Sequence, residues 1–350
     1  MPQVIALGDI NVDVIAHIPY YPQPGGDGVA RRAQLYSGGS AANTALVLAR
    51  CGVDIGLIAR VGRDALAAQT LVELIDAGVD GRQIQYDPDL VTGVMFVAVT
   101  PDGERTMFGY RGANTCLDAE LLRPDEIARA SVLHISGYAL LESPQRDAAL
   151  RALDIAHRAG VKVSLDVGVE AAQHLSYEIR NLLPLVDWIF PNELEAKFIT
   201  GRTTDQRAVA WLLDRGLEAV ILKLGARGCV IGTSEGVWFI PAFGVEVQDT
   251  TGAGDSFDAG FIAGRLGGLN WCASGVLANA LGGLAASVVG AGEALPGPEE
   301  AIRLLKQQAT NEVWRDWQTE VQAVLSFLES LALRKVLQVG AGFPEPVRTE

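Results

Sequence analysis

The chain has 350 residues, of which 49% are hydrophobic, and a formal net charge of −14. This length and composition predict a globular protein with one large domain or two ordinary ones. The negative charge argues against a nucleic-acid partner, because phosphate-backbone binding needs clustered Lys and Arg and the chain has no run of them. The four cysteines form no Cys-x-x-Cys pair and the four histidines lie at no metal-ligand spacing, which indicates free thiols in a reducing compartment.

Two apolar segments bear on targeting. The N-terminal run "MPQVIALGDINVD" is ended by Asp9 and is too short for the core of a signal peptide. Residues 266–292 contain no charged residue, but 15 of these 27 residues are Gly, Ala or Ser. Such weak hydrophobicity predicts a helix buried in a protein core rather than a membrane span. We therefore expect a cytoplasmic protein with no membrane segment.

In chain order, short β-branched runs alternate with amphipathic stretches. The expected strands are "VIALG" at Val4, "IGLIARVG" at Ile55, "SVLHIS" at Ser131, "VKVSLDV" at Val161, "DWIFPN" at Asp187 and "AVILKLG" at Ala219. The expected helices include residues 64–77, 145–159 and 205–215. This alternation predicts an α/β protein with helices around a mostly parallel sheet.

Residues 12–36 and 92–111 break the alternation. Both read as strands without intervening helices, and the second contains a hairpin turned at Pro101, Asp102 and Gly103. We expect them to form a small β lid over the main domain that excludes water from a reaction. A small sheet with one exposed face needs cover, so we also expect a homodimer.

The C-terminal end differs from the rest. We expect a domain over residues 1–307 and a helical appendix over 308–350. The apolar stripe of this appendix consists of Trp314, Trp317, Val321, Val324, Leu325, Leu328 and Leu331. The stripe either packs on its own domain, which we favour, or binds a partner.

The stretch "QDTTGAGDSF" lies between an expected strand at residues 244–247 and a helical pattern. Gly252, Ala253 and Gly254 leave the backbone N–H groups of a helix start open to an anion, and phosphate fits such a site. There is no Gly-Lys dipeptide for a Walker-type loop, and "GAGDSF" and "GAGEAL" lack the last glycine of G-x-G-x-x-G. Asp255 is either an acid that interacts with the helix dipole or a base that takes the proton of an attacking hydroxyl.

Residues 249–255 match "D-T-x-G-A-G-D", and the chain from about Val4 to about Leu305 resembles the ribokinase-like (PfkB) family of carbohydrate kinases. The resemblance implies a three-layer α/β/α core with a mostly parallel sheet and a small β lid. It also implies phosphoryl transfer from ATP, with Mg²⁺, to a primary hydroxyl of a small sugar such as ribose or fructose. Asp255 would be the general base and the backbone of Gly252, Ala253 and Gly254 the anion hole.

Two further motifs imply the acceptor site. "YSGGSAAN" resembles the first family motif, in which Gly38, Gly39 and Asn43 close on the sugar. "GDINVDVI" resembles the N-terminal strand end, where Asp13 binds sugar hydroxyls and Asn11 lies near it. Without the resemblance, the first motif is more often a simple turn and Asp13 a solvated loop acid.

The resemblance implies that a further set of residues binds the nucleotide and magnesium. "PNELEAKFITG" places Asn192 and Glu195 where the family organises Mg²⁺ and phosphate, although by spacing alone they equally fit a helix cap with a capping box. The family positions near ATP phosphates, ribose and adenine are Lys223, Gly225, Gly228 and Asn279. In a Gly- and Ala-rich helix, the Asn279 side chain would otherwise bond a neighbouring backbone group.

Some members bind a monovalent cation such as K⁺, and the matching positions here are Asp249, Thr251, Ala285, Val288 and Gly290. Ala294 stands where several of those members have Ser, which weakens the assignment.

The sequence does not decide whether the phosphoryl acceptor is a sugar or a nucleoside. "GGSAAN" differs from the "GGKGAN" of typical ribokinases. "LDVGVE" departs from "D-x-N-x-R" at Gly168 and Glu170, which disfavours fructose and keto-deoxy sugars. The alternatives are a nucleoside kinase of the same family and a catalytically silent sugar-sensing protein. Intact Asp255, Asn192 and Glu195 count against the silent protein.

Overall fold

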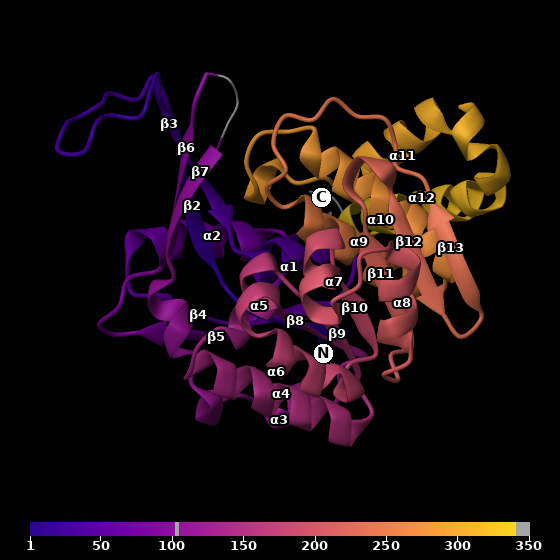
Figure 1. Cartoon of the computed structure of the whole chain (residues 1–350), viewed down its shortest axis with the longest axis horizontal. Helices are drawn as coiled ribbons and strands as arrows, with labels where there is room; N and C mark the ends of the chain where they lie inside the picture. The colour runs from indigo at the N-terminus through magenta and orange to yellow at the C-terminus, as the bar shows by residue number, and fades with distance from the viewer. Residues whose placement is uncertain (102–104, 341–350) are drawn as a thin grey trace, which may run out of the picture.

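The computed structural model describes residues 1–101 and 105–340, so Asp102 and Gly103 of the expected turn lie outside the described residues. A nine-stranded sheet forms the centre of the molecule, in the order β13-β12-β11-β10-β9-β8-β1-β4-β5 (Figure 1). The seven strands from β5 to β11 in this order are parallel, and β12 and β13 add an antiparallel edge. The strands are β1 (Val4–Leu7), β4 (Ile55–Gly62), β5 (Asp80–Asp87), β8 (Val132–Ser136), β9 (Lys162–Asp166), β10 (Trp188–Phe190), β11 (Ala219–Lys223), β12 (Cys229–Thr233) and β13 (Gly236–Ile240).

Both faces of this sheet are covered by helices, as parallel strands require. Along β1, Val4 and Ala6 belong to one hydrophobic cluster and Ile5 and Leu7 to the other, because successive side chains point to opposite faces. Residues of α1, α2 and α9–α12 contribute to the first cluster, and residues of α3–α8 contribute to the second. The expected three-layer α/β/α core is therefore confirmed.

The helices on the first face are α1 (Ser40–Arg50), α2 (Ala65–Asp76), α9 (Ala253–Leu266), α10 (Trp271–Ala286), α11 (Pro298–Gln308) and α12 (Gln318–Gly340). Those on the second face are α3 (Pro124–Ile127), α4 (Gln145–Ala159), α5 (Val169–His174), α6 (Ser176–Leu182), α7 (Glu193–Thr200) and α8 (Asp205–Leu213). Short 3₁₀ turns occur at η1 (Gly112–Cys116), η2 (Ala119–Leu121), η3 (Gly137–Leu140), η4 (Leu183–Leu185), η5 (Gly225–Arg227), η6 (Gly292–Ala294) and η7 (Glu312–Trp317).

A separate four-stranded sheet is built from the two regions that break the α/β alternation. Its strands are β2 (Asn11–His17), β3 (Arg32–Gly38), β6 (Gly93–Val99) and β7 (Arg105–Tyr110), in the order β3-β2-β6-β7. β2 and β6 are parallel, whereas the β2–β3 and β6–β7 pairs are antiparallel. This small sheet projects from the α/β body at the upper left of Figure 1. The two separate chain regions thus form the small sheet that the sequence predicts.

The segment before the glycine loop is not a strand, so the expectation for residues 244–247 is wrong. β13 already forms the edge of the sheet, and the chain leaves it there. Glu246 and Val247 are exposed, and the backbone N–H groups of Gln248 and Asp249 donate to the carbonyl of Ala286 at the end of α10. The β-like composition therefore reflects an extended connection rather than a paired strand.

The charge-free region of residues 266–292 forms the buried helix α10. Within the part of the chain that the structure describes, no helix has the length and apolar character needed to cross a membrane.

The last helices pack onto this same core. Trp314 is fully buried and stacks on Phe243 with ring centroids 4.0 Å apart. Val321, Val324 and Leu328 of α12 are also fully buried in the cluster that contains α10. The apolar stripe therefore packs on its own chain, as favoured from the sequence.

Substitution of Trp314 tests this packing. We expect Trp314→Ala to lower the free energy of unfolding by about 3 to 5 kcal/mol, because it leaves a large cavity under the stacked Phe243 ring. Trp317→Ala, which alters a half-buried ring on the same stripe, should cost much less. Urea unfolding followed by circular dichroism measures both. Equal losses would show that the burial of Trp314 is not what holds the last helices.

Candidate active site

The candidate site lies beyond the carboxyl ends of the parallel strands, where open α/β sheets usually bind ligands. Asp9 follows β1, Asp166 ends β9 and Lys223 ends β11. The N-terminus of α9, with Asp255 in its first turn, meets the same edge. Residues far apart in the sequence are therefore brought together by the strand order.

The glycine loop starts α9 in a conformation that leaves backbone donors available. Gly252 is the N-cap with φ 72°, a left-handed value that favours glycine. The hydrogen bond from the Ser256 N–H to the Gly252 carbonyl, at 2.9 Å, is the first i to i−4 bond of the helix. The N–H groups of Gly254 and Asp255 precede that bond, so they belong to the helix-start donors that have no intrahelical acceptor.

A cation lies directly under this turn. A Cβ atom placed on Gly254 would lie 3.6 Å from the Lys223 Nζ. A helix N-terminus with a lysine ammonium beside it, and with small residues at 252–254, fits a phosphate group.

Asp255 is held by two side chains of α1. The Ser40 hydroxyl donates to Oδ1 and the Asn43 amide to Oδ2, both at 2.8 Å. Burial raises the pKa of Asp255 to about 6, with a further contribution from the negative charge of Asp166, while the two hydrogen bonds oppose the increase. The carboxylate is thus oriented, ionised at neutral pH and more basic than an ordinary aspartate.

Lys223 lies in a buried ion cluster. Its Nζ is 2.8 Å from Asp166 Oδ1 and 3.2 Å from Asp258 Oδ1, and the lysine side chain is 14% exposed. These carboxylates raise the pKa of Lys223 despite its burial. The ammonium keeps the pKa of Asp166 below its usual range, whereas complete burial raises that of Asp258. The lysine predicted near ATP phosphates is therefore bonded to two acids, at a position just beneath the glycine loop.

Asn192 and Glu195 form a capping box at the start of α7. The Glu195 N–H donates to Asn192 Oδ1 at 2.9 Å, and the Asn192 N–H donates to Glu195 Oε2 at 2.8 Å. Glu195 is only 4% exposed, and burial raises its pKa to about 7. The helix-cap alternative is therefore realised, and it keeps a carboxyl group within electrostatic range of Lys223 and Asp166.

The carboxyl groups near the loop fit magnesium bound through phosphates. Among residues 1–101 and 105–340, no cluster of three or more His, Cys, Asp or Glu is arranged to hold a metal ion. Mg²⁺ in phosphoryl-transfer sites usually keeps several waters and takes one or two carboxylates besides substrate phosphates. Glu195 and Asp166 can supply that contribution.

The predicted acceptor residues meet at the base of the small sheet. Asp13 is 6% exposed, and burial together with the charges of Asp255 and Asp249 raises its pKa to about 7. A Cβ on Gly38 would lie 2.5 Å from Asp13 Oδ2, so glycine is required beside this carboxyl group. Gly39 has φ 98° and forms the N-cap of α1. Asp13, the Gly38–Gly39 turn and, through its bond to Asp255, Asn43 thus lie close to one another.

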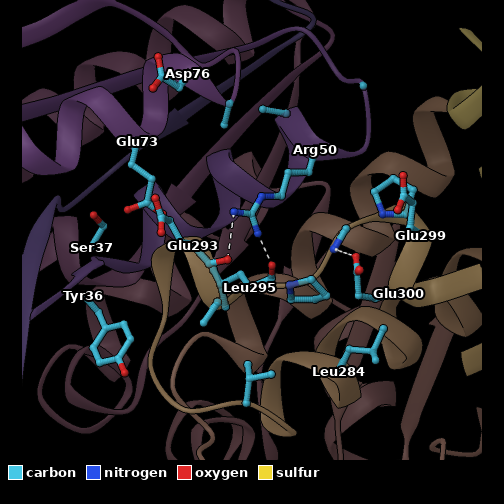
Figure 2. A pocket seen from close by; sticks show the side chains of 18 of the residues that line it. Tyr36, Ser37, Arg50, Glu73, Asp76, Leu284, Glu293, Leu295, Glu299 and Glu300 are labelled. Carbon is cyan, nitrogen blue, oxygen red and sulfur yellow. Dashed lines mark hydrogen bonds between the residues drawn. The ribbon is translucent and has the colours of Figure 1, made fainter. Parts of the chain in front are cut away.

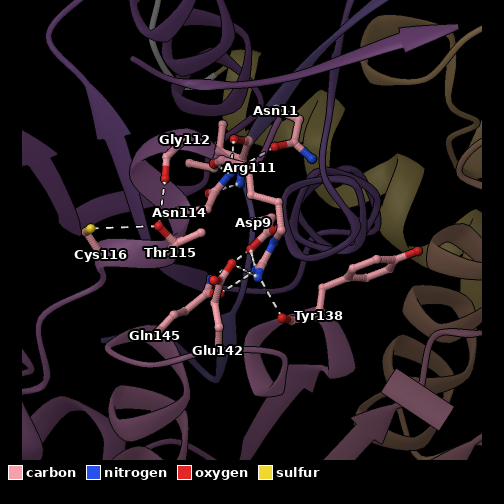
Figure 3. A network of polar contacts seen from close by, with 11 residues as sticks. Asp9, Asn11, Arg111, Gly112, Asn114, Thr115, Cys116, Tyr138, Glu142 and Gln145 are labelled. Carbon is pink, nitrogen blue, oxygen red and sulfur yellow. Dashed lines mark hydrogen bonds and ion pairs between the residues drawn. The ribbon is translucent and has the colours of Figure 1, made fainter. Parts of the chain in front are cut away.

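A second polar network centres on Arg111 (Figure 3). Its guanidinium donates from Nε and Nη2 to the two carboxylate oxygens of Asp9, at 3.1 and 2.9 Å, and from Nη1 to Glu142 at 3.3 Å. Gln145 donates to Asp9 Oδ1 at 2.7 Å. The network ties the start of the small sheet to η3 and α4.

Asn11 belongs to the edge of this network. The Asn114 amide donates to Asn11 Oδ1 at 2.9 Å and to the Ile10 carbonyl at 3.1 Å (Figure 3). Asn11 is therefore held at the point where β2 leaves the main domain.

The predicted nucleotide positions lie on the antiparallel edge of the main sheet. Gly228 has φ 106°, and a Cβ there would lie 2.1 Å from the Ile240 carbonyl oxygen. Gly225 begins η5 with φ 57°. The Asn279 amide donates to the carbonyls of Ile240 and Pro241 at 3.2 and 3.0 Å. These residues join the β12–β13 hairpin to α10, and their contacts with a nucleotide stay a prediction.

Asp249 links the two loops predicted to hold a monovalent cation. Its Oδ1 accepts from the Thr251 N–H and hydroxyl at 2.9 and 2.7 Å, and its Oδ2 accepts from the Gly290 N–H at 2.9 Å. Ala285 and Val288 lie at the end of α10 and just after it. The loops that the prediction names are thus adjacent in space.

A cavity of about 2030 Å³ lies beside these loops, between β3, α1, α2 and α11 (Figure 2). Arg50 crosses it and donates to the carbonyls of Glu293, at 3.3 Å, and Leu295. The Leu295 side chain reaches the glycine loop, since a Cβ on Gly252 would lie 2.7 Å from its Cδ2. The wall of the cavity therefore supports the loop, although the cavity lies apart from the cluster around Asp255.

Four residues of the site were not predicted from the sequence. Ser40 lies inside the quoted "GGSAAN", and Asp166 inside "LDVGVE". Asp258 follows Asp255 by three residues on α9, and Arg111 is part of "YRGAN". Residues three apart on a helix lie on the same face, so the spacing of Asp255 and Asp258 was a sequence signal that could have identified Asp258. The partners of Arg111 and Asp166 come from distant segments.

Comparisons with known proteins identify the family and the fold. A family model described as "pfkB family carbohydrate kinase" matches residues 1–298. Ribokinase from Haemophilus influenzae is 31% identical over 307 residues, which cover 86% of this chain and 97% of that protein. 2-Dehydro-3-deoxygluconokinase from Bacillus subtilis is 32% identical over 285 residues, covering 78% of this chain and 87% of that protein.

The fold is also similar to that of an Escherichia coli protein assigned as ribokinase II. Its structure in complex with ATP and Mg²⁺ superimposes with a TM-score of 0.79 at 27% identity. The alignment covers 88% of this chain and 100% of that chain.

Removal of the Lys223 charge tests the buried ion cluster. We expect Lys223→Met to lower the free energy of unfolding by about 3 to 5 kcal/mol, because Asp258 would keep a buried carboxyl group without a cation. Lys162→Met is the matched control, since Lys162 is 47% exposed and its pairs lie at the surface, where the loss should stay below about 1 kcal/mol. Urea unfolding at pH 7 measures both variants. Similar losses would contradict the buried cluster.

Proposed function

Because the chain belongs to the pfkB family of carbohydrate kinases, we propose that it transfers the γ-phosphoryl group of ATP to a primary hydroxyl of a small sugar, with Asp255 as the general base. The observation that carries this proposal is the position of Asp255. Its carboxylate is oriented by α1, has a pKa raised to about 6 and lies in the first turn of a helix whose N-terminus fits phosphate.

Asp255 is suited to abstract the acceptor proton. The acceptor oxygen forms its bond to phosphorus while its proton passes to the Asp255 carboxylate and the bond to the leaving ADP oxygen breaks. A base works best when its pKa lies near the operating pH, because it is then both ionised and strongly basic. The raised pKa of Asp255 meets this condition better than that of an exposed aspartate.

The glycine loop would stabilise the charge of the transferring group. The N–H groups of Gly254 and Asp255 and the positive end of the α9 dipole point toward the same space. Lys223 adds positive charge beneath the loop and is held in place by Asp166 and Asp258. Bound Mg²⁺ would neutralise charge on the phosphate oxygens, with Glu195 and Asp166 nearby to hold its water ligands.

The acceptor would lie between the small sheet and α1. Asp13, Asn11 and the backbone of Gly39 would bond sugar hydroxyls, and Asn43 would link the acceptor site to Asp255 through its hydrogen bond to that carboxylate. Two relatives carry the names ribokinase and 2-dehydro-3-deoxygluconokinase, which refer to different sugars. A small sugar is therefore the substrate class that we propose.

We extend the proposal to a monovalent cation such as K⁺ near Asp249 and Thr251. What supports it is the contact between the two loops, in which Asp249 bonds the Gly290 N–H. A cation at this junction would alter the loop that leads directly into Gly252.

We also propose that the small sheet pairs with a second copy of the chain. Leu35, Phe96 and Phe108 occupy one row across β3, β6 and β7, with Val14 of β2 between the first two. Their exposed fractions are 48%, 52% and 61%. Asp13, the preceding residue of β2, faces the opposite side, toward Asp255. An apolar row directed away from the site is suited to cover by another copy.

Loss of the base is the direct test of the mechanism. We expect Asp255→Asn to reduce turnover by about 10²- to 10⁴-fold, because the near-isosteric amide cannot accept the proton. Wild-type turnover should fall about tenfold for each unit below pH 6, where Asp255 becomes protonated. Turnover is measured by ADP release at saturating ATP and acceptor, with ribose, fructose and other small sugars in the panel.

Asp249→Asn serves as the comparison and should cost less, because the described hydrogen bonds of the Asp249 carboxylate hold Thr251 and Gly290 of the two loops in place. Circular dichroism checks that both variants fold. Near wild-type turnover by a folded Asp255→Asn variant would rule out the proposed base.

Disruption of the apolar row tests the pairing. We expect Phe108→Asp to convert a dimer into a monomer at micromolar concentration, because a carboxylate would be buried at the interface without a partner. Tyr177→Asp, at a side chain that is 69% exposed on α6, should leave the dimer intact. Light scattering after gel filtration gives the masses. A monomeric wild-type protein would refute this part of the proposal.

A further inference from the structure

Ser40 links the general base to the buried ion cluster. It is the first residue of α1 and follows the N-cap Gly39. Its hydroxyl lies 2.8 Å from Asp255 Oδ1 and 3.3 Å from Asp166 Oδ2. A hydroxyl has a single proton, so it can donate to only one of these two carboxylates at a time.

Ser40 and Asn43 together control the orientation of Asp255. The two residues are three positions apart on α1 and therefore share one face of the helix. Ser40 reaches one carboxylate oxygen and Asn43 the other. A carboxylate with a donor on each oxygen cannot rotate without breaking a charge-assisted hydrogen bond, which is stronger than a neutral one.

The two carboxylates that can accept the Ser40 proton, Asp255 and Asp166, differ in whether they keep their charge during the reaction. Asp166 is paired with Lys223 at 2.8 Å and keeps its negative charge. Asp255 loses its charge when it takes the acceptor proton. A neutral carboxyl group is a weaker acceptor than a carboxylate. The preferred acceptor for the Ser40 proton therefore changes from Asp255 to Asp166 when the proton is transferred.

We propose that Ser40 is a positioning residue that holds the Asp255 carboxylate for proton abstraction and turns its hydroxyl to Asp166 once Asp255 is protonated. The step is a rotation of the Ser40 hydroxyl; the proton that Asp255 receives comes from the acceptor. This inference rests on the proposed function of Asp255. In this proposal, Ser40 stabilises the form of Asp255 that is ionised and correctly oriented for proton abstraction.

Other charged and titratable groups also face Asp255. They are Asp13 of β2, Tyr138 of η3, Asp166 of β9, Lys223 of β11 and Asp258 of α9. Only Ser40 and Asn43 donate side-chain hydrogen bonds to its carboxylate among the described contacts. Removal of the Ser40 hydroxyl therefore changes the hydrogen bonding of the base without changing any of the surrounding charges.

The test compares Ser40→Ala with Ser40→Thr and Thr44→Val. In Ser40→Ala we expect turnover at saturating substrates to fall about tenfold, because a hydrogen bond to a charged group is lost. The acid limb of the pH profile should move upward by about half a unit to one unit, since the lost bond favoured the ionised form. The Michaelis constants should change little. Ser40→Thr, which keeps the hydroxyl, should restore the wild-type limb.

Thr44→Val is the matched control. Thr44 lies one turn along α1 from Ser40, and its hydroxyl donates to the backbone carbonyl of Asp255 at 3.4 Å rather than to the carboxylate. This variant should leave the acid limb in place. If Ser40→Ala lowers turnover without moving the limb, or if Thr44→Val moves it equally, Ser40 has only a structural role and the proposal is overturned.

A second measurement is independent of turnover. The melting temperature of Ser40→Ala should fall further below that of the wild type at pH 8, where Asp255 is ionised, than at pH 5, where it is protonated. A difference that does not change with pH would overturn the Ser40 inference. Near wild-type turnover by Asp255→Asn would instead overturn the proposed base, so the two failures are distinguishable.

Discussion

The buried ammonium group of Lys223 is the interaction on which the site depends. It joins the ends of β9 and β11 to α9 through Asp166 and Asp258, so that one cation connects two strands of the sheet to the helix that carries Asp255. A buried carboxylate without a cation is costly, and Lys223 therefore favours the ionised form of Asp258 against the effect of burial, which raises its pKa. The glycine loop rests directly above this group.

The same cluster sets the chemistry of Asp255. Burial, together with the negative charge of Asp166, raises the pKa of Asp255, and Ser40 and Asn43 oppose this rise by donating to the carboxylate. Asp255 is consequently neither an ordinary surface acid nor a neutral buried one. α1 supplies both donors, and α1 begins at the glycine pair that also borders Asp13. The residues predicted to bind the acceptor and Asp255 are thus parts of one connected arrangement.

Much of the fold could be predicted because local patterns agree with the tertiary structure. The runs at Val4, Ile55 and Ala219 are strands of the main sheet, and the helix expected at residues 145–159 is α4. The expected strand at residues 244–247 failed because this extended segment connects β13 to the glycine loop and its end bonds the Ala286 carbonyl of α10 instead of a neighbouring strand. For the candidate site, the helix start was predicted where a motif is contiguous, as with Gly252 to Asp255 at the start of α9. Asp258 and Asp166 were missed because their importance lies in a shared partner, Lys223.

The sequence by itself determined the class of the protein, since the α/β alternation, the glycine loop and Asp255 are local features whose physical meaning does not require distant partners. It also determined that residues 266–292 contain a buried helix, because their small apolar residues suit close packing. Only the tertiary structure decided that Lys223 bonds two acids, that Ser40 and Asn43 bond the Asp255 carboxylate, and that the last helix belongs to the core. The reason is physical: hydrogen bonds, burial and the resulting pKa values depend on which distant residues the strand order brings within reach.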